Sequence, residues 1–163
     1  MEVRVFWIGK TRLPGVAELT GEYARRLGRF CDFRAEEVRP NPSRDREGAV
    51  KARKSGAGAG MAKVEAAMLA RSADSHLVAL DPSGRQWNSQ EFDGFLKGLR
   101  EGGTRAVSFC VGGADGFSPK FQQEADLLLS ISPLTLPHEL ARVVLLEQIY
   151  RAWTLLAHHP YPR

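Results

Sequence analysis

The chain has 163 residues, of which 43% are hydrophobic and 26% charged, and this composition indicates one globular domain large enough to bury a core. It contains no apolar run long enough to cross a bilayer, and its first residues lack the charged start and cleavage site of a signal peptide. We therefore expect a cytoplasmic protein that does not bind membranes. Cys31 and Cys110 lie far apart and form no CxxC motif, which favours reduced thiols and argues against a zinc site.

The positive charge is concentrated in the N-terminal part of the chain. The formal net charge is +4, but residues 1–63 contain 14 Lys or Arg against 8 Asp or Glu. A basic segment favours a polyanionic partner, most often a nucleic acid. Many soluble proteins are basic without such a partner, so charge alone leaves both interpretations open.

The first elements predicted along the chain are two strands and a helix. Residues 2–8 alternate between apolar and polar side chains, which is the period of a strand. Apolar residues then recur at helical spacing between Pro14 and Gly28, a proline suited to a first turn and a glycine suited to a helix end. Residues 30–38 predict a second, weaker strand. The side of the first strand expected to be apolar carries Val3, Val5 and Trp7.

Residues 44–72 are helical in composition but contain three glycines close together. Each glycine weakens a helix by about 1 kcal/mol relative to alanine, so we expect a broken helix or a mobile segment near residues 56–60. A basic cluster precedes the glycines. It is either a solvated helix face or an arm that contacts phosphates. Its members are Arg44, Arg46, Lys51, Arg53 and Lys54.

The C-terminal half predicts three buried strands separated by helices. The apolar runs at residues 76–80, 106–111 and 126–131 are typical of strands in a parallel sheet. Asn88 and Glu91 have the spacing of a capping box ahead of an amphipathic helix. A short helix from Ser118 and Pro119 to Glu124 and a long final helix complete the pattern. The alternation of strands and helices indicates an α/β fold, a mostly parallel sheet with helices on both faces.

Three loops are expected at the carboxyl ends of the strands, where open parallel sheets bind their ligands. They are residues 81–84, 112–116 and 132–138, all rich in Gly, Pro and Ser. Such loops expose main-chain groups and favour a small polar cofactor. The sequence contains no early GxGxxG, P-loop, HExxH or GxSxG motif, which argues against phosphate-cradling cofactors. The GGADG motif at 112–116 taken alone is equally compatible with a plain turn that needs a positive φ.

The final helix begins with two residues that can perform chemistry. His138 and Arg142 are four positions apart, so they share a helix face near the end where the three loops gather. Such a pair is either structural or part of a site. Glu147 and Arg151 have the same spacing and predict a surface ion pair. The expected apolar stripe of this helix consists of Leu140, Val143, Val144, Ile149, Trp153 and Leu156.

The sequence resembles a known family over essentially its whole length. The matching motifs are VALD at 78–81, VGGADGFSP at 111–119 and LTLPHELARVVLLEQIYRAW at 134–153, followed by HHPYPR, together with IGK at 8–10 and EYARRLGRF at 22–30. They are similar to those of the SPOUT-class large-subunit ribosomal RNA methyltransferases, which modify N-3 of pseudouridine. The motif at 134–153 is highly specific, whereas GGADG alone is weak.

The resemblance implies a single SPOUT methyltransferase domain over residues 1–163, with a deep trefoil knot in its C-terminal part. It implies S-adenosylmethionine as cofactor and a homodimer in which the tail of one subunit completes the site of the other. It also implies a substrate in 23S ribosomal RNA within the assembled ribosome. The cofactor contacts carried over from the family are Leu80, Gly112, Ile131, Ser132, Pro133, Leu134, Thr135 and Leu136.

Roles follow for the residues around the expected cofactor loops. We expect Arg142 to stabilise negative charge on N-3 or to bind a phosphate, and His138 to line the pocket as a candidate base. In the tail we expect His159, Tyr161 and Arg163 to contact RNA. The chain departs from the family at Pro162, where a second histidine is expected. That histidine's role is therefore absent here or has moved to His158 or His159.

Three alternatives remain open from the sequence. A related knotted methyltransferase could modify a ribose hydroxyl or a transfer RNA. A basic module could bind RNA or the ribosome without catalysis. A purely structural dimerisation protein is the third alternative, and the three cofactor-type loops argue against it.

Overall fold

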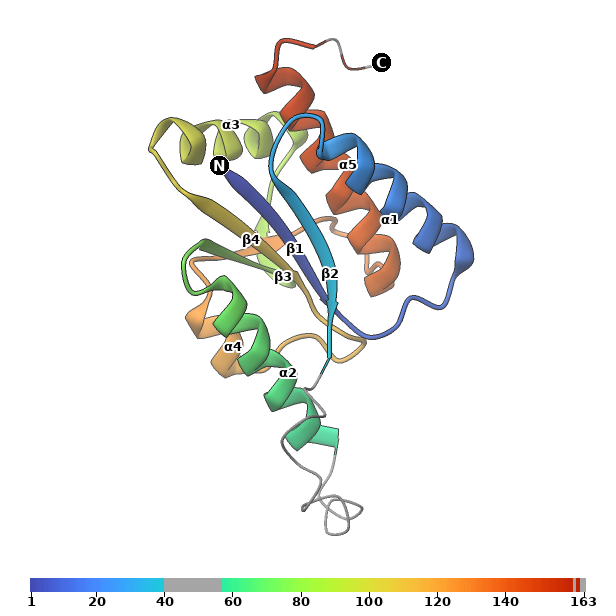
Figure 1. The fold of residues 1–163 in the computed structure, drawn as a ribbon. Helices are drawn as coiled ribbons and strands as arrows, with labels where there is room; N and C mark the ends of the chain where they lie inside the picture. Colours follow the sequence, from blue (N-terminus) through green and yellow to red (C-terminus); the bar gives the residue numbers. More distant parts are fainter. Residues whose placement is uncertain (40–56, 160, 162–163) are drawn as a thin grey trace.

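The computed structural model describes residues 1–39, 57–159 and 161, and strands alternate with helices through these parts of the chain (Figure 1). The alternation agrees with the sequence pattern. In chain order the elements are β1 (Glu2–Ile8), α1 (Pro14–Leu27), β2 (Phe33–Val38), α2 (Ala57–Ser72), β3 (His76–Gln86), α3 (Ser89–Glu101), β4 (Ala106–Val111), α4 (Pro119–Glu124), β5 (Leu127–Ser130) and α5 (His138–Leu156).

The strands form one five-stranded sheet in the order β2-β1-β4-β3-β5, and every pair of neighbours runs parallel. The expected α/β class with a parallel sheet is therefore confirmed. β4 lies at the centre and all six of its residues are buried, as its continuous apolar run predicts. Because all strands are parallel, their carboxyl ends meet at one edge of the sheet.

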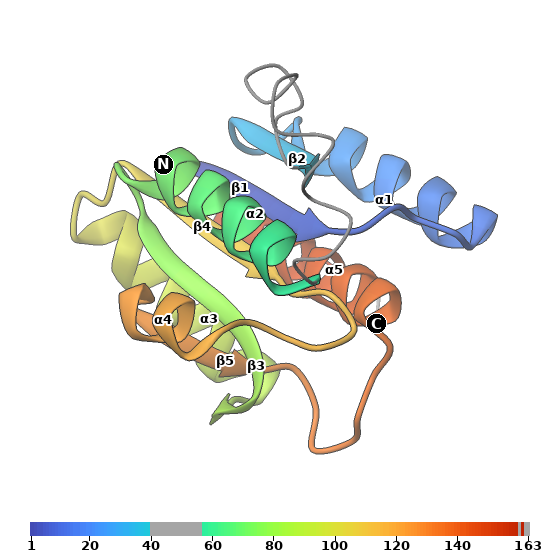
Figure 2. The same ribbon diagram turned by 90° about the horizontal axis from the view of Figure 1, so that it is seen from below.

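Helices cover both faces of the sheet (Figures 1 and 2). α1, α3 and α5 pack together on one face, and α2 and α4 pack on the other. The alternation in β1 explains this arrangement. Val3, Val5 and Trp7 enter the core under α5, whereas Phe6 and Ile8 enter the core under α2. Each fully buried side chain of this size stabilises the fold by about 1.5–3 kcal/mol.

Local capping signals are confirmed at two helices. At α3, Asn88 Oδ1 accepts a hydrogen bond from the Glu91 N–H (2.9 Å), and Glu91 Oε2 accepts one from the Asn88 N–H (2.8 Å). At α4, Ser118 Oγ accepts a hydrogen bond from the Phe121 N–H at 3.3 Å. These bonds satisfy main-chain donors that a helix leaves without partners in its first turn.

The turn expected after Leu80 is present as a bulge within β3. Leu80 and Arg85 both pair with Leu129, so residues 81–84 loop out between them, and Asp81 Oδ1 accepts a hydrogen bond from the Ser83 N–H at 2.8 Å. Gly84 makes this pairing possible because its main chain lies directly against β5. A Cβ atom at Gly84 would stand 2.5 Å from the carbonyl carbon of Leu128, closer than any side chain permits.

The helices bear on two further expectations. α2 begins at Ala57, inside the glycine segment where a break was expected, and the residues before it, with the basic cluster of residues 44–54, lie outside the described residues. The apolar stripe of α5 is also rotated from the expected one: Leu140 and Val144 are exposed. The buried residues of α5 are Glu139, Arg142, Leu145, Leu146, Ile149, Ala152, Trp153 and Thr154.

The predicted ion pair between Glu147 and Arg151 does not occur among the ion pairs of the described residues. Glu147 instead accepts hydrogen bonds from the Tyr161 hydroxyl and the Gln148 amide. Arg151 lies over the Tyr161 ring, with its guanidinium carbon 5.4 Å from the ring centroid. In the part of the chain that the structure describes, no helix is long and apolar enough to span a bilayer.

Candidate active site

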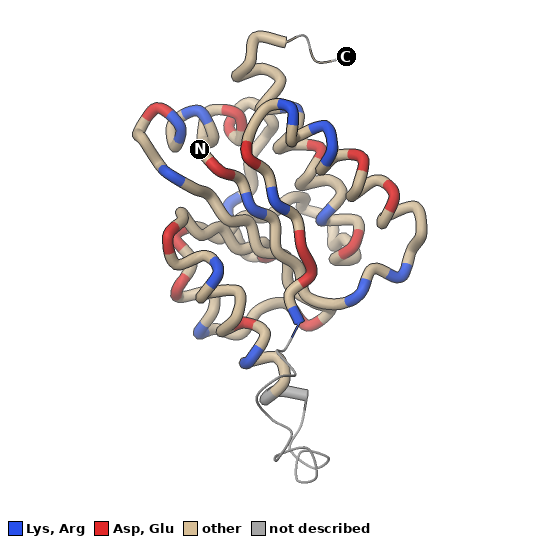
Figure 3. Tube along the Cα trace, in the orientation of Figure 1, with Lys and Arg blue, Asp and Glu red and all other residues tan. Residues whose placement is uncertain are grey.

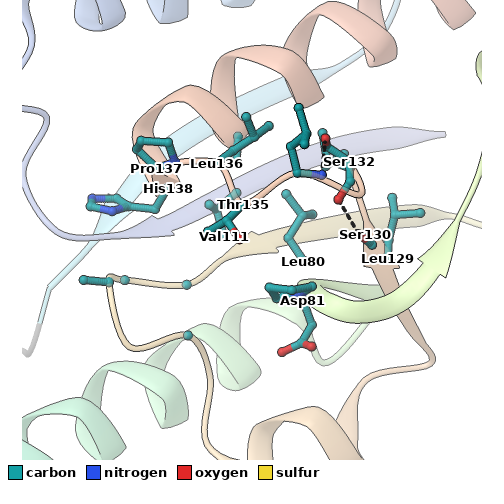
Figure 4. Close-up of a pocket in the computed structure, with 18 residues that line it drawn as sticks. Leu80, Asp81, Val111, Leu129, Ser130, Ser132, Thr135, Leu136, Pro137 and His138 are labelled. Carbon is teal, nitrogen blue, oxygen red and sulfur yellow. Dashed lines mark hydrogen bonds between the residues drawn. The ribbon is translucent and has the colours of Figure 1, made fainter.

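A cavity of about 570 Å³ opens at the carboxyl ends of β3, β4 and β5. The three loops expected to share this position do meet here (Figure 4). Of the residues predicted to bind a cofactor, Pro133 does not line the cavity. The predicted residues that do line it are Leu80, Gly112, Ile131, Ser132, Leu134, Thr135 and Leu136.

The lining is mainly apolar side chains and main chain. Among the described residues that line the cavity, none is Lys or Arg, and Asp81 and His138 are the titratable side chains. The last loop is shaped by its own short-range hydrogen bonds. Ser130 Oγ donates to the Ser132 carbonyl (3.0 Å), and the Leu134 N–H donates to Ser132 Oγ (2.9 Å). The cavity therefore suits a ligand with apolar parts that is recognised through main-chain groups, and it does not suit a phosphate.

The glycine-rich motif after β4 is both a turn and a wall of the cavity. The Gly116 N–H donates to the Gly113 carbonyl at 3.1 Å, and Gly116 has a φ of 72°. A Cβ atom at Gly112 would lie 3.1 Å from the Gly116 main chain. The turn interpretation is thus confirmed, and the same turn brings Gly112 and Gly113 to the cavity.

Side chains outside the cavity hold two of its walls in place. Glu65 of α2 is 5% exposed, and its carboxylate accepts hydrogen bonds from the Ser118 N–H (2.7 Å) and Oγ (2.6 Å). Four residues later, Gln122 donates to Asp81 Oδ2 at 2.8 Å. The other Asp81 oxygen accepts hydrogen bonds from Ser83. In Figure 4 the Asp81 carboxylate accordingly points toward α4 and away from the loop of residues 132–138.

His138 and Arg142 do not point into the same space, which corrects the expectation drawn from their spacing. His138 lines the cavity, whereas Arg142 is absent from its lining. The Arg142 guanidinium lies over the Trp7 ring, 4.2 Å from the centroid, and donates a hydrogen bond to Thr11 Oγ1 at 2.8 Å. Arg142 is 1% exposed, and burial lowers the pKa of its guanidinium, an effect that Glu139 and Glu37 oppose.

Glu139 is a buried residue that the sequence pattern did not single out. Its carboxylate accepts hydrogen bonds from the Arg12 N–H (3.0 Å) and the Leu13 N–H (3.2 Å). These main-chain bonds, with Arg12 contributing most, lower the pKa of Glu139. No local signal marks this role, because the two donors lie 127 and 126 positions away in the sequence.

The predicted RNA-binding tail lies at the opposite end of α5 from His138 (Figure 1). His159 is exposed, and its ring lies 6.0 Å from that of Phe30. Tyr161 packs its ring edge against Tyr150 at 6.0 Å and donates its hydroxyl hydrogen to Glu147. That hydrogen bond, together with burial, raises the pKa of Tyr161 to about 12. Pro162 and Arg163 lie outside the described residues.

No cluster of His, Cys, Asp or Glu able to hold a metal ion occurs among the described residues. Cys31 and Cys110 are both free thiols. Burial raises the pKa of each thiol to about 12, so neither behaves as a ready nucleophile.

Comparison with known proteins agrees with this architecture. The solved structure of tRNA (m1G37) methyltransferase from Aquifex aeolicus superimposes with a TM-score of 0.60, over 100% of this chain and 75% of that chain. Its sequence is 13% identical, so the likeness is one of fold.

Relatives of similar length are much closer in sequence. Proteins named ribosomal RNA large subunit methyltransferase H are 40% identical in Chromobacterium violaceum, 38% in Koribacter versatilis and 34% in Paraburkholderia phytofirmans. Each alignment covers at least 99% of this chain and 97% of the relative. A family model described as "Predicted SPOUT methyltransferase" matches residues 1–162. The chain therefore belongs to the SPOUT methyltransferase family, the family of the ribosomal RNA large subunit methyltransferase H proteins.

Proposed function

We propose that this protein transfers a methyl group from S-adenosylmethionine to N-3 of a pseudouridine in 23S ribosomal RNA, within assembled ribosomes in the cytoplasm. The observation that carries the proposal is the apolar cavity walled by the main chain of three loops, in a chain of this family. The names of the full-length relatives support ribosomal RNA as the substrate. The methylated atom, N-3 of a pseudouridine, and the assembled ribosome make the proposal more specific than those names are.

The cavity fits the cofactor in shape and charge. Leu80, Val111, Leu129 and Leu136 offer apolar surface for an adenine ring, and the loop of residues 131–136 lines the cavity beside them. S-adenosylmethionine is a net cation, and a lining without Lys or Arg among the described residues suits such a ligand. Gly112 and Gly113 allow close approach, since neither has a side chain. When bound, the cofactor supplies an electrophilic methyl group.

His138 is the residue that we assign to proton transfer. N-3 of a uridine-like base carries a proton that must leave when the nitrogen is methylated. A ring nitrogen of His138 at the cavity accepts it, which makes His138 the general base. Arg142 lies behind the cavity wall on Trp7 and Thr11, so we assign it a positioning role and not contact with the base.

The proposed unit is a homodimer. Leu140, Val144 and Leu155 are 43%, 37% and 44% exposed on α5, which leaves an apolar stripe for a second subunit. α5 has 19 residues and so separates His138 from the tail by about 27 Å. The RNA contacts proposed for His159, Tyr161 and Arg163 therefore serve the cavity of the other subunit.

The C-terminal trefoil knot is also part of the proposal. It is supported by the match of the SPOUT family model to residues 1–162.

The direct test is methylation of ribosomes purified from cells that lack this protein, using methyl-labelled S-adenosylmethionine. Assembled ribosomes should accept label at N-3 of one pseudouridine in 23S ribosomal RNA, mapped by mass spectrometry, and separate subunits should accept much less. Label on a ribose hydroxyl or on transfer RNA would overturn the proposed target. Absence of cofactor binding by calorimetry would instead favour a non-catalytic RNA-binding module.

A truncation tests the role of the tail and the dimer. Deletion of residues 158–163 should abolish methylation while leaving cofactor affinity nearly unchanged, because the tail lies far from the chain's own cavity. Mixing the truncated protein with a His138→Asn variant should restore part of the activity if one subunit's tail serves the other's cavity. Normal methylation by the truncated protein would show that the tail only packs against α5.

A further inference from the structure

The loop between β1 and α1 presents two cations beside the proposed active site. Lys10 and Arg12 are exposed, and Figure 3 shows that the connection between β1 and α1 carries basic residues. Gly9, with a φ of 93°, turns the chain out of β1 into this loop. The nearby carboxylate of Glu37 pairs with Arg39 at 2.8 Å, and Arg39, with a smaller contribution from Lys10, lowers the pKa of Glu37.

Two buried charged residues of α5 fix this loop. Glu139, 6% exposed, accepts hydrogen bonds from the Arg12 and Leu13 N–H groups, and Arg142, 1% exposed, donates to Thr11 Oγ1. Burying a charged side chain is unfavourable unless it is paired or hydrogen-bonded. Glu139 and Arg142 both find hydrogen-bond partners in the loop of residues 9–13. These bonds hold the loop backbone in a defined position, although the side chains of Lys10 and Arg12 face solvent.

The loop is adjacent to the cavity because the same helix turn serves both. His138 and Ala141 line the cavity. Glu139 is the residue after His138, and Arg142 is the residue after Ala141. No Lys or Arg occurs in the described lining, so the negative charge of an RNA backbone has to be met outside the cavity. The cationic loop held by Glu139 and Arg142 lies outside the lining, against the same turn of α5 as His138.

We propose that Lys10 and Arg12 bind backbone phosphates of the RNA whose base enters the cavity, and that Glu139 and Arg142 are positioning residues for this phosphate site. The substrate class rests on the proposed function. Because phosphate contacts fix register and orientation on a nucleic acid, the site sets how the base is presented to His138.

The test compares two double variants that remove equal charge. Lys10→Ala with Arg12→Ala removes the site, and Arg71→Ala with Arg105→Ala removes two exposed cations near the amino-terminal ends of β3 and β4. Substrate ribosomes from cells lacking the protein are the probe. The first variant should raise the KM for ribosomes about tenfold at physiological salt and lower the salt slope of binding by about 1.4–1.8. Its cofactor affinity should stay at the wild-type value, and the control should leave KM nearly unchanged.

Glu139→Gln separates positioning from charge. This substitution makes the protein more positive, so charge alone would tighten ribosome binding. Loss of loop positioning would instead weaken ribosome binding. We therefore expect Glu139→Gln to raise the KM for ribosomes and to leave cofactor affinity unchanged. Tighter binding by Glu139→Gln, or equal effects of the two double variants, would overturn the phosphate site. If the wild-type protein neither binds nor methylates ribosomes, the proposed function fails first, so the two failures are distinguishable.

Discussion

Glu65 of α2 accepts two hydrogen bonds from Ser118, one from its main-chain N–H at 2.7 Å and one from its hydroxyl at 2.6 Å. Ser118 also caps α4, and Gln122 of the same helix donates to Asp81 at the cavity. One hydrogen-bonded series thus connects α2, α4 and the end of β3. It lies behind the two cavity walls formed by residues 81–82 and 112–116.

Weakening this series should loosen the cavity. Glu65→Gln retains one carbonyl oxygen but replaces the other acceptor with an amide donor, so one of the two bonds to Ser118 is lost. We expect the free energy of unfolding to fall by about 1–3 kcal/mol and cofactor binding to weaken several-fold by calorimetry. Glu18→Gln, at an exposed position of α1, is the matched control and should change neither. Lower stability with wild-type cofactor affinity would show that Glu65 supports the fold alone.

Gly84 and Gly98 should respond in opposite directions to alanine. At Gly84 a Cβ atom would stand 2.5–2.6 Å from the main chain of Leu128 and Leu129, so Gly84→Ala must separate β3 from β5. We expect a loss of more than about 3 kcal/mol, by analogy with severe overpacking. Gly98 lies in α3 with nothing within 4 Å, so Gly98→Ala should stabilise the protein by about 1 kcal/mol. Denaturant unfolding of both variants measures the contrast, and a mild effect at Gly84 would contradict the close approach.

His138 should affect turnover more than binding. If its ring nitrogen accepts the proton from the base, His138→Asn should lower kcat by about 10²–10⁴. Cofactor affinity should change little, because most of the lining is apolar side chain and main chain. His76→Asn, at the opposite end of the sheet, is the control and should keep kcat. An effect of His138→Asn confined to KM would indicate contact with substrate without proton transfer.

Tyr161 should ionise well above an ordinary tyrosine. Its hydroxyl donates to Glu147, and this bond together with burial raises its pKa from 10.0 to about 12. A raised folded-state pKa means that the stabilisation is fully present below pH 10 and is lost as the pH rises from about 10 to about 12. Tyrosinate absorbance during an alkaline titration should therefore lose its last step in Tyr161→Phe. In Glu147→Gln that step should move to lower pH. A Tyr161 that ionises near 10 in the wild-type protein would show that the tail is not docked on its own α5.

Much of the fold followed from neighbouring residues. The alternation in residues 2–8, the capping box of Asn88 and Glu91, and the Ser118 cap depend on side chains and main chain only a few positions apart. The three loops could be placed at one edge because parallel strands end together, and the cavity lies at that edge. The motifs distributed over the whole chain also identify the family without reference to the tertiary structure.

The failures concern residues whose environment comes from distant parts of the chain. The stripe of α5 was misplaced because two polar side chains, Glu139 and Arg142, occupy the buried face while Leu140 and Val144 are exposed. Judged by polarity alone, Glu139 and Arg142 would be exposed, and Leu140 and Val144 would be buried. The turn expected at residues 81–84 is present as a bulge in β3, but the close approach of Gly84 to β5 joins distant parts of the chain and could not be predicted from local spacing.

The sequence by itself determined the α/β class, the parallel sheet and the loops that form the cavity, since each depends on local spacing. It also determined the family, which depends on motifs. Only the tertiary structure decided that His138 faces the cavity while Arg142 lies under the loop of residues 9–13. Arg142 and Thr11 are 131 positions apart, and Glu65 and Ser118 are 53 apart. Periodicity along one helix gives the direction of a side chain but not what the rest of the chain places there.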